Sequence, residues 1–312
     1  MELNIVDLRT EPNDLRGISL CAGYAGLDLG LHIAEPGYRT VAFVEREAHA
    51  AATLVARMED ASLAPAPIWD DLKSFDGRPW RGRVHIVSAG YPCQPFSFAG
   101  ARRGEEDPRH LWPEVARIVD EVQPEWVFCE NVEGHISLGL ADVAAELRGM
   151  GYTPKAGMFS AREAGASHVR RRVFLLAHAN GERRGIFSGS GDCGPGADND
   201  GAFRLLDGEW WTVRPQHVGA QLDVAVVDDE GAGLDACRQI DRIFPPGPGE
   251  FQEWDRILHR RPDLQPALLR SDDGVADRVE RSRAAGNGVC SLAAAVAWKT
   301  LSAAHLGRAA AP

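Results

Sequence analysis

The chain has 312 residues, of which 44% are hydrophobic and 25% charged, a composition typical of a globular protein with one large and one smaller domain. No apolar run is long enough to span a bilayer, and the segment from Met1 to Gly17 is too polar for a signal peptide. The six cysteines are scattered and include no CxxC pair, which disfavours structural zinc and a disulfide framework. The formal net charge of −11 by itself argues against a nucleic-acid partner, unless basic side chains gather on one local face.

Residues 18–33 predict a strand, a glycine turn and a helix. The segment starts apolar, passes through Gly23, Ala25 and Gly26, and then resumes the apolar spacing of a helix. This order is the first half of a nucleotide-binding βαβ unit. Structural turns of the same composition are common, so the turn alone leaves both interpretations open.

The next apolar run, residues 40–44, predicts a second strand that ends at Glu45, and residues 48–58 predict an alanine-rich helix. A carboxylate at the end of the second strand can accept hydrogen bonds from both hydroxyls of a ribose, although a solvated strand end is the alternative. A short apolar pair then runs into Asp70 and Asp71. One of these acids could accept from an adenine amine, and both could equally be turn or N-cap residues.

Residues 84–94 carry a thiol just beyond a predicted buried strand. The β-branched run at 84–87 ends in the small residues 88–90, and Cys93 follows Pro92, whose ring stiffens the backbone. Ligands bind at the carboxyl ends of strands in an open α/β sheet, which makes Cys93 a candidate nucleophile. A buried small hydrophobe is the alternative interpretation of a lone cysteine.

A carboxylate is predicted at the same edge of the sheet. Residues 95–110 are polar and rich in glycine and arginine, as in a loop beside a site, and residues 111–122 have helical spacing. Residues 126–128 predict another buried strand, which ends close to Glu130. Two strands would therefore deliver a thiol and a carboxylate to one edge.

The following segment predicts a helix at 137–150 and strands at 154–160 and 173–177. A basic run lies between the two strands. Alternate residues of a strand share a face, so Arg170 and Arg172 can point the same way, toward a phosphate or a carbonyl oxygen. A solvated basic turn is the alternative.

The character of the chain changes from about residue 180 to residue 276, where glycine, proline and aspartate dominate and periodicity is weak. Residues 181–280 contain 11 Lys and Arg against 20 Asp and Glu, so most of the acidity sits there. This segment predicts a separate, loop-rich small domain. Residues 286–298 are a glycine turn that leads into an apolar helix, typical of core scaffold.

Four motifs occur together in the order of one known family: PCQ at 92–94, ENV at 130–132, RRR at 170–172 and GNGV at 286–289. With these motifs the chain resembles the DNA cytosine-5 methyltransferases of restriction-modification systems and phages. The resemblance implies an α/β class, the S-adenosylmethionine (SAM)-dependent methyltransferase Rossmann-like fold, with a mixed, mostly parallel sheet, helices on both faces and a small loop-rich target-recognition domain.

The resemblance also implies three parts of the chain. Residues 1–180 would form the SAM-binding catalytic domain, residues 181–276 the target-recognition domain, and residues 277–312 a segment that returns to the catalytic domain. The composition change near residue 180 agrees with the first of these boundaries.

The resemblance assigns roles to individual residues. Cys93 matches the nucleophile that attacks carbon 6 of a flipped cytosine, Glu130 the carboxyl group at the ring nitrogen and exocyclic amine, and Arg170 and Arg172 the arginines near the carbonyl oxygen and backbone. The implied cofactor residues are Cys21, Ala22, Gly23, Gly26, Glu45, Asp71, Asn287 and Val289. The implied substrate-binding residues are Pro92, Gln94, Ser97, Asn131, Val132 and His168, and no metal is implied.

The residue types suit this chemistry. A thiolate can add to carbon 6 and later leave, which divides one hard step into easier ones, and a carboxyl group stabilises charge that develops on the ring. The chain departs from the family at Cys21, where phenylalanine is usual, at Ala25, where glycine is usual, and at His168, where glutamine is common. None of these departures removes a reacting group.

The expected partner is double-stranded DNA, with a cognate restriction endonuclease as a further candidate, and no membrane contact is expected. The protein itself is expected to be a monomer in the cytoplasm, associated with the nucleoid through DNA. Local basic surface would come from arginines around the cleft, namely Arg102, Arg103, Arg162, Arg170, Arg172, Arg183 and Arg184. The alternatives are a tRNA cytosine-5 methyltransferase, an inactive DNA-binding relative, and a thiol hydrolase that pairs Cys93 with a histidine. A thiol hydrolase would leave the glycine loop, Glu45 and the GNGV motif without a role.

Overall fold

The computed structural model describes residues 14–92, 111–180, 246, 249–260 and 288–306. The strands are β1 (Leu15–Leu20), β2 (Tyr38–Val44), β3 (Ile68–Trp69), β4 (Ile86–Ala89), β5 (Trp126–Val132), β6 (Tyr152–Ser160) and β7 (Arg171–Ala179). The helices are α1 (Gly26–Ala34), α2 (Ala48–Glu59), α3 (Trp112–Val122), α4 (Leu140–Gly149), α5 (Phe251–Arg260) and α7 (Ser291–His305), with short 3-10 turns η1 (Arg78–Trp80) and η3 (Glu133–Ile136).

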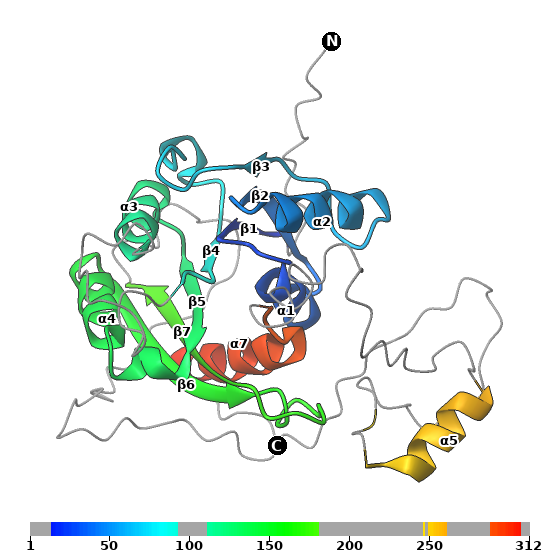
Figure 1. Cartoon of the computed structure of the whole chain (residues 1–312). Coiled ribbons are helices and arrows are strands. Elements are labelled where there is room, and N and C mark those ends of the chain that lie inside the picture. The colour runs from blue at the N-terminus through cyan, green and yellow to red at the C-terminus, as the bar shows by residue number, and fades with distance from the viewer. Residues whose placement is uncertain (1–13, 93–110, 181–245, 247–248, 261–287, 307–312) are drawn as a thin grey trace, which may run out of the picture.

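The strands among the described residues form one seven-stranded sheet in the order β3-β2-β1-β4-β5-β7-β6 (Figure 1). All pairs from β3 to β5 are parallel, and β7 is antiparallel to both of its neighbours. From β1 the chain adds β2 and β3 on one side of the sheet, and it then returns to place β4 and the later strands on the other side of β1. The order therefore reverses between β1 and β4, and the carboxyl ends of these two strands frame the crevice in which open α/β sheets bind ligands.

Helices cover both faces of the sheet, as the sequence predicts (Figure 1). On one face, apolar side chains of α3 and α4, such as Val119 and Leu147, pack with Val87 and Val127 of the central strands. On the other face, α1 and α7 pack together over β5 and β7. Burial of both sheet faces explains why the central strands are continuous apolar runs rather than alternating ones.

The helices and strands expected from the sequence are confirmed, with shifted ends at a few places. The strand expected at 126–128 continues to Val132, because β7 pairs with it as far as the Val132 and Arg172 positions. The helix expected to start at residue 137 begins at Leu140, after the η3 turn. Glu130 is therefore part of a strand rather than a residue just beyond its end.

Most of residues 181–276 lies outside the described part of the chain, so the expected domain boundaries stay predictions. Within this segment the structure describes α5, an amphipathic helix with Phe251 exposed at its start. None of the helices that the structure describes is both long enough and apolar enough to cross a membrane.

Candidate active site

The loop between β1 and α1 lies at the point where the strand order reverses. Cys21, Gly23 and Ala25 all have left-handed backbone, with φ of 51°, 54° and 58°. Glycine adopts this conformation without steric cost, whereas alanine adopts it only at a steric cost. Ala25, the position where the resembling family usually has glycine, therefore keeps the backbone conformation of a glycine. A Cβ atom on Gly23 would meet no atom within 4 Å, so the loop has open space at this point.

Glu45 holds this loop from the end of β2. One carboxylate oxygen accepts from the amide of Gly23 at 2.7 Å, and the other accepts from the amide of Glu47 at 2.6 Å. Each carboxylate oxygen can accept two hydrogen bonds, so both retain capacity for a ribose hydroxyl. The carboxylate acceptor that the sequence predicts is therefore present and held in place beside the loop, and it fits the hydroxyl donors at the ribose end of a nucleoside cofactor.

Asp71 lies in a turn that follows β3. Its Oδ1 accepts from the amide of Lys73 at 3.0 Å, which is the turn role that the sequence analysis kept as the alternative. Arg117 of α3 donates to the carbonyl oxygens of Leu72 at 2.9 Å and Phe75 at 3.0 Å, so the helix fastens the turn to the fold. Half-buried Asp71 keeps one oxygen available to an adenine amine.

Gly90 lies close to both the β1–α1 loop and the carboxylate of Glu130. It directly follows β4, and its amide donates to the carbonyl oxygen of Leu20 at 3.2 Å. A Cβ atom on Gly90 would lie 3.6 Å from the carbonyl oxygen of Cys21 and 3.9 Å from Oε2 of Glu130. The β1–α1 loop, the chain leading to Pro92 and the carboxylate of β5 therefore meet at one edge, as the sequence predicts.

Buried Glu130 of β5 forms an ion pair with half-buried Arg172 of β7. The Arg172 Nε lies 2.9 Å from Oε1 of Glu130, whose residue is 8% exposed. Burial raises the pKa of Glu130 to about 7, against the opposing effect of the positive charges of Arg172 and Arg170. The carboxyl group can therefore hold or release a proton near neutral pH, as a general acid or base requires.

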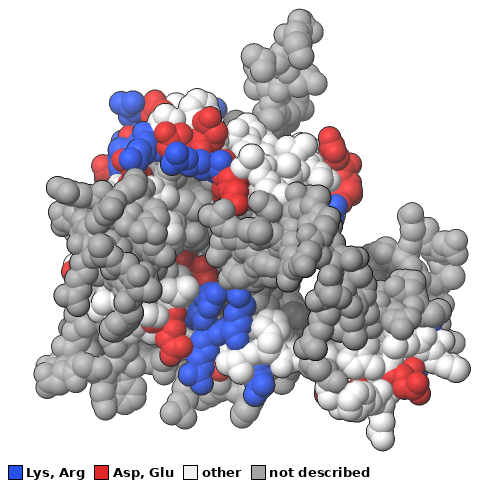
Figure 2. Space-filling model, viewed as in Figure 1, with Lys and Arg blue, Asp and Glu red and all other residues white. Residues whose placement is uncertain are grey.

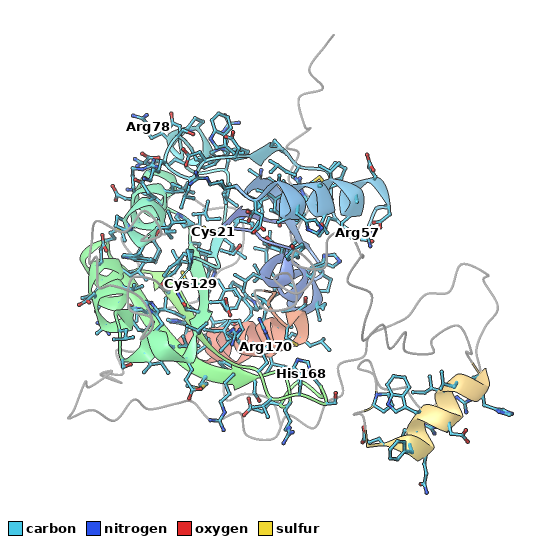
Figure 3. All side chains as sticks on the ribbon, in the orientation of Figure 1. Cys21, Arg57, Arg78, Cys129, His168 and Arg170 are labelled. Carbon is cyan, nitrogen blue, oxygen red and sulfur yellow. The ribbon has the colours of Figure 1, made fainter. Side chains whose placement is uncertain are left out.

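Arg170 lies just before β7 rather than within a strand, with a φ of 31°. Its guanidinium donates to the carbonyl oxygen of Gly288, 118 residues further along the chain. Figure 3 labels Arg170 next to the ribbon of α7, in keeping with this contact. The side chain of Arg171 is at the surface, where its Nη1 lies 3.9 Å from Oε1 of Glu133. The positive charges of Arg170 and Arg172 therefore act on Glu130, and that of Arg171 does not.

Val289 of the last motif contacts the start of α1. A Cβ atom on Gly26 would lie 2.7 Å from the carbonyl oxygen of Val289 and 2.8 Å from its Cβ. Only glycine therefore allows this approach. The contact joins two segments, more than 260 residues apart in the sequence, that the resemblance assigns to the cofactor.

The asparagine of the ENV motif is buried and has a clear structural role. Asn131 is 5% exposed, its Nδ2 donates to the carbonyl oxygen of Tyr91 at 3.1 Å, and its Oδ1 accepts from the amide of Val132 at 2.9 Å. The Tyr91 hydroxyl lies 3.0 Å from Nε2 of His135. Asn131 thus anchors the chain that leads to Pro92, and its substrate contact stays a prediction. Val132 and His168 are exposed.

Several predicted residues lie outside the described part of the chain: Cys93, Gln94, Ser97 and Asn287. Among the described cysteines, Cys21 and Cys129 are held as protonated thiols. Burial raises the pKa of both to about 12, and at Cys21 the charge of Glu45 adds to the effect. A thiol in this state is a poor nucleophile.

Three groups at this edge were not predicted from the sequence: Tyr91, His135 and the carbonyl group of Gly288. No sequence signal identifies them, because each acts through a contact between segments far apart in the chain. Figure 2 shows one group of basic side chains near the centre of the molecular face, over the region where Figure 3 labels Arg170. Of the arginines expected to form a local basic surface, Arg162, Arg170 and Arg172 are described, whereas Arg102, Arg103, Arg183 and Arg184 lie outside the described residues, so the basic contact surface for DNA stays a prediction.

Comparison with known proteins identifies the family of this arrangement. Residues 15–192 match the model of the C-5 cytosine-specific DNA methylases. The chain is 32% identical over 167 residues to the type II methyltransferase M.NgoMIV of Neisseria gonorrhoeae, covering 52% of this chain and 51% of the relative. It is 39% identical over 118 residues to the type II methyltransferase M.PspPI of Psychrobacter, covering 38% of this chain and 27% of the relative.

The chain thus spans about half or less of the length of these relatives. Among solved structures, S. pombe Dnmt2 methyltransferase matches at 22% identity with a TM-score of 0.44, over 56% of this chain and 52% of that one.

Proposed function

The chain belongs to the C-5 cytosine-specific DNA methylase family, and on that premise we propose that it methylates carbon 5 of a flipped cytosine in a specific sequence of double-stranded DNA. One observation carries the proposal: buried Glu130, paired with half-buried Arg172, lies at the sheet edge where the chain leads from β4 toward Pro92, the residue before Cys93 in the sequence. Glu130 of the ENV motif and Arg172 of the arginine motif lie at this edge, and Pro92, the first residue of the PCQ motif, follows Gly90 by two positions.

Cys93 is the proposed nucleophile. A thiolate adds to carbon 6 of the ring, and this addition makes carbon 5 nucleophilic. The protonated state of Cys21 and Cys129 supports the assignment, since neither of these thiols could compete. The target base must leave the duplex, because carbon 6 cannot be reached within the base stack.

Glu130 is the proposed acid at the ring nitrogen. Its pKa of about 7 leaves a proton available near neutral pH, and that proton balances the charge that builds on the ring when Cys93 adds. Arg172 holds the carboxyl group in one orientation through its Nε. The second guanidinium, Arg170, adds positive potential at the same place.

SAM is the proposed methyl donor and, when bound, supplies an electrophilic methyl group. The fit rests on Glu45 for the ribose hydroxyls, Asp71 for the adenine amine and the open β1–α1 loop around Gly23. Once carbon 5 carries the methyl group, its remaining proton passes to solvent water, the Cys93 thiolate leaves carbon 6, and the ring nitrogen returns its proton to Glu130, which releases the product. The family is a methylase family, and the named relatives are type II methyltransferases, which supports a cognate restriction endonuclease as a cellular partner.

Trapping the covalent adduct tests this proposal. The target is first located by bisulfite sequencing of DNA from cells that express the protein. A duplex with 5-fluorocytosine at that target should then give a complex that survives denaturation when SAM is present, because fluorine cannot leave carbon 5 as a cation. Cys93→Ala should abolish the complex, and Cys129→Ala should retain it.

Peptide mapping gives the attachment point. An adduct at another cysteine, or one that survives Cys93→Ala, contradicts the mechanism. Methyl transfer from tritiated SAM to tRNA but not to DNA would favour the tRNA alternative. Absence of transfer to either substrate would indicate an inactive DNA-binding relative.

A further inference from the structure

Arg170 connects the arginine motif to the last motif of the fold. Its guanidinium donates to the carbonyl oxygen of Gly288, which directly precedes Val289. The left-handed backbone at Arg170, with a φ of 31°, turns the chain at this point just before β7 begins. An uncommon backbone conformation in a non-glycine residue is retained only when its surroundings hold it in place.

The contact continues to the cofactor loop. Val289 lies against Gly26 with no room for a side chain between them, and Gly26 is the first residue of α1. Gly30, one turn further along α1, packs equally closely on α7, where a Cβ atom would lie 2.6 Å from the Cβ of Ala294. Arg170 therefore holds the Gly288–Val289 segment that precedes α7, and this segment in turn packs against the end of the β1–α1 loop.

The same guanidinium acts on the proposed acid. The positive charge of Arg170 lowers the pKa of Glu130, alongside the larger effect of Arg172. A guanidinium has five donors in a rigid plane, so one arm can serve a carbonyl oxygen while the charge still faces a carboxylate. Arg172 has the other arrangement, because its Nε pairs directly with Glu130 and its Nη1 donates to the carbonyl oxygen of Arg171.

We propose that Arg170 is a positioning residue that holds the Gly288–Val289 segment against the cofactor loop, so that cofactor affinity depends on a side chain at the cytosine pocket. This inference rests on the proposed function. It divides the arginine motif into two roles. Arg172 serves the proposed acid, and Arg170 serves the cofactor site through Gly288, Val289 and Gly26.

Calorimetry with S-adenosylhomocysteine in the absence of DNA separates the two roles. Arg170→Ala should weaken binding by roughly five- to tenfold, less than the direct loss of a hydrogen bond from a charged donor, because Arg170 acts on the cofactor site only through Gly288 and Val289. Arg170→Lys should recover part of the loss, because an ammonium group can still donate to the Gly288 carbonyl oxygen. Arg172→Ala should change affinity by less than about twofold, although it removes a neighbouring charge of the same sign.

Arg171→Ala is the matched control, since that side chain is exposed and lies near Glu133 on the surface. Thermal melting without ligand, run for every variant, identifies a general loss of folding. Arg170→Lys keeps the test decisive should Arg170→Ala fold poorly. A merely structural role would lower the melting temperature of Arg170→Ala without a selective loss of affinity in the folded protein.

Equal affinities of Arg170→Ala and wild type for S-adenosylhomocysteine overturn the inference and leave the proposed function standing. An equal loss in Arg172→Ala also overturns it, because the effect would then be one of charge alone. A wild-type protein that does not bind S-adenosylhomocysteine overturns the proposed function together with the inference.

Discussion

At Glu130 two physical effects oppose each other. Burial disfavours the charged carboxylate, and the guanidinium at 2.9 Å favours it. Burial is the larger effect, so the pKa rises to about 7 rather than falling below the usual range of glutamate. This balance is what an acid that works near neutral pH requires, and it makes a stability measurement informative.

Glu130 should make the folded protein less stable as pH rises. The unfolded chain releases the proton of Glu130 near pH 4.5, whereas the folded chain keeps it until about pH 7. Between these values the folded state binds one more proton, so the free energy of unfolding should fall by up to about 1.4 kcal/mol per pH unit from this group. Urea denaturation of wild type and Glu130→Gln at pH 5, 6, 7 and 8 measures the difference.

Glu130→Gln should lack this slope, and Glu133→Gln, an exposed neighbour, should keep it. The positive charge of Arg172 lowers the pKa of Glu130. In Arg172→Ala that charge is lost and the pKa should rise further, so the slope should extend above pH 7. Identical pH dependence in wild type and Glu130→Gln would show that Glu130 is already ionised in the folded protein at pH 5.

At the scale of the elements, the packing of α1 on α7 brings together the first and last of the segments proposed to bind the cofactor. The loop before α1 contains Gly23, and the segment before α7 contains Val289. A Cβ atom on Gly30 would lie 2.6 Å from the Cβ of Ala294 and 2.7 Å from the carbonyl oxygen of Ser291. The helix axes can approach this closely only because residue 30 has no side chain.

Gly30→Ala should therefore separate the two helices. We expect a loss of about 1–3 kcal/mol in the free energy of unfolding, the usual effect of added volume in a packed contact. Gly149→Ala is the matched control, because a Cβ atom there would meet no atom within 4 Å, and alanine is the better helix former. Thermal melting should show a lower midpoint for Gly30→Ala only, and a stable Gly30→Ala variant would show that the contact yields easily.

Most helices and strands could be predicted from the sequence, because the helices have helical apolar spacing and the strands are short continuous apolar runs. The 40–44, 126–128 and 173–177 strands and the 48–58 and 111–122 helices are present with shifted ends. The position of β7 between β5 and β6 could not be predicted, since strand order depends on pairing between distant segments. The burial of Asn131 was missed for the same reason, because its partner Tyr91 lies 40 residues away.

At the scale of the whole molecule, the reversal of strand order explains how scattered motifs form one site. Residues of the β1–α1 loop, the end of β4, the middle of β5 and the segment before α7 meet because β1 and β4 are neighbours. The resemblance assigned these residues to one site before any geometry was known. Contacts within the site, such as that of Arg170 with Gly288, required the fold itself.

The segment 181–276 is the largest part of the chain that contributes no proposed reacting group. The proposed nucleophile and acid lie before it, and Val289 lies after it. A segment of this kind can choose the DNA sequence without taking part in chemistry, because base contacts specify a site while the catalytic pocket acts on one flipped base.

Exchange of residues 181–276 for the matching segment of a relative with another target should therefore move the methylated site. Bisulfite sequencing of plasmid DNA from cells that express the chimera gives the new target directly. The affinity for S-adenosylhomocysteine should stay within about twofold of wild type, because Glu45 and Val289 are unchanged. A chimera that binds S-adenosylhomocysteine and still methylates the original target would place sequence choice elsewhere, with residues 95–110 as the next segment to exchange.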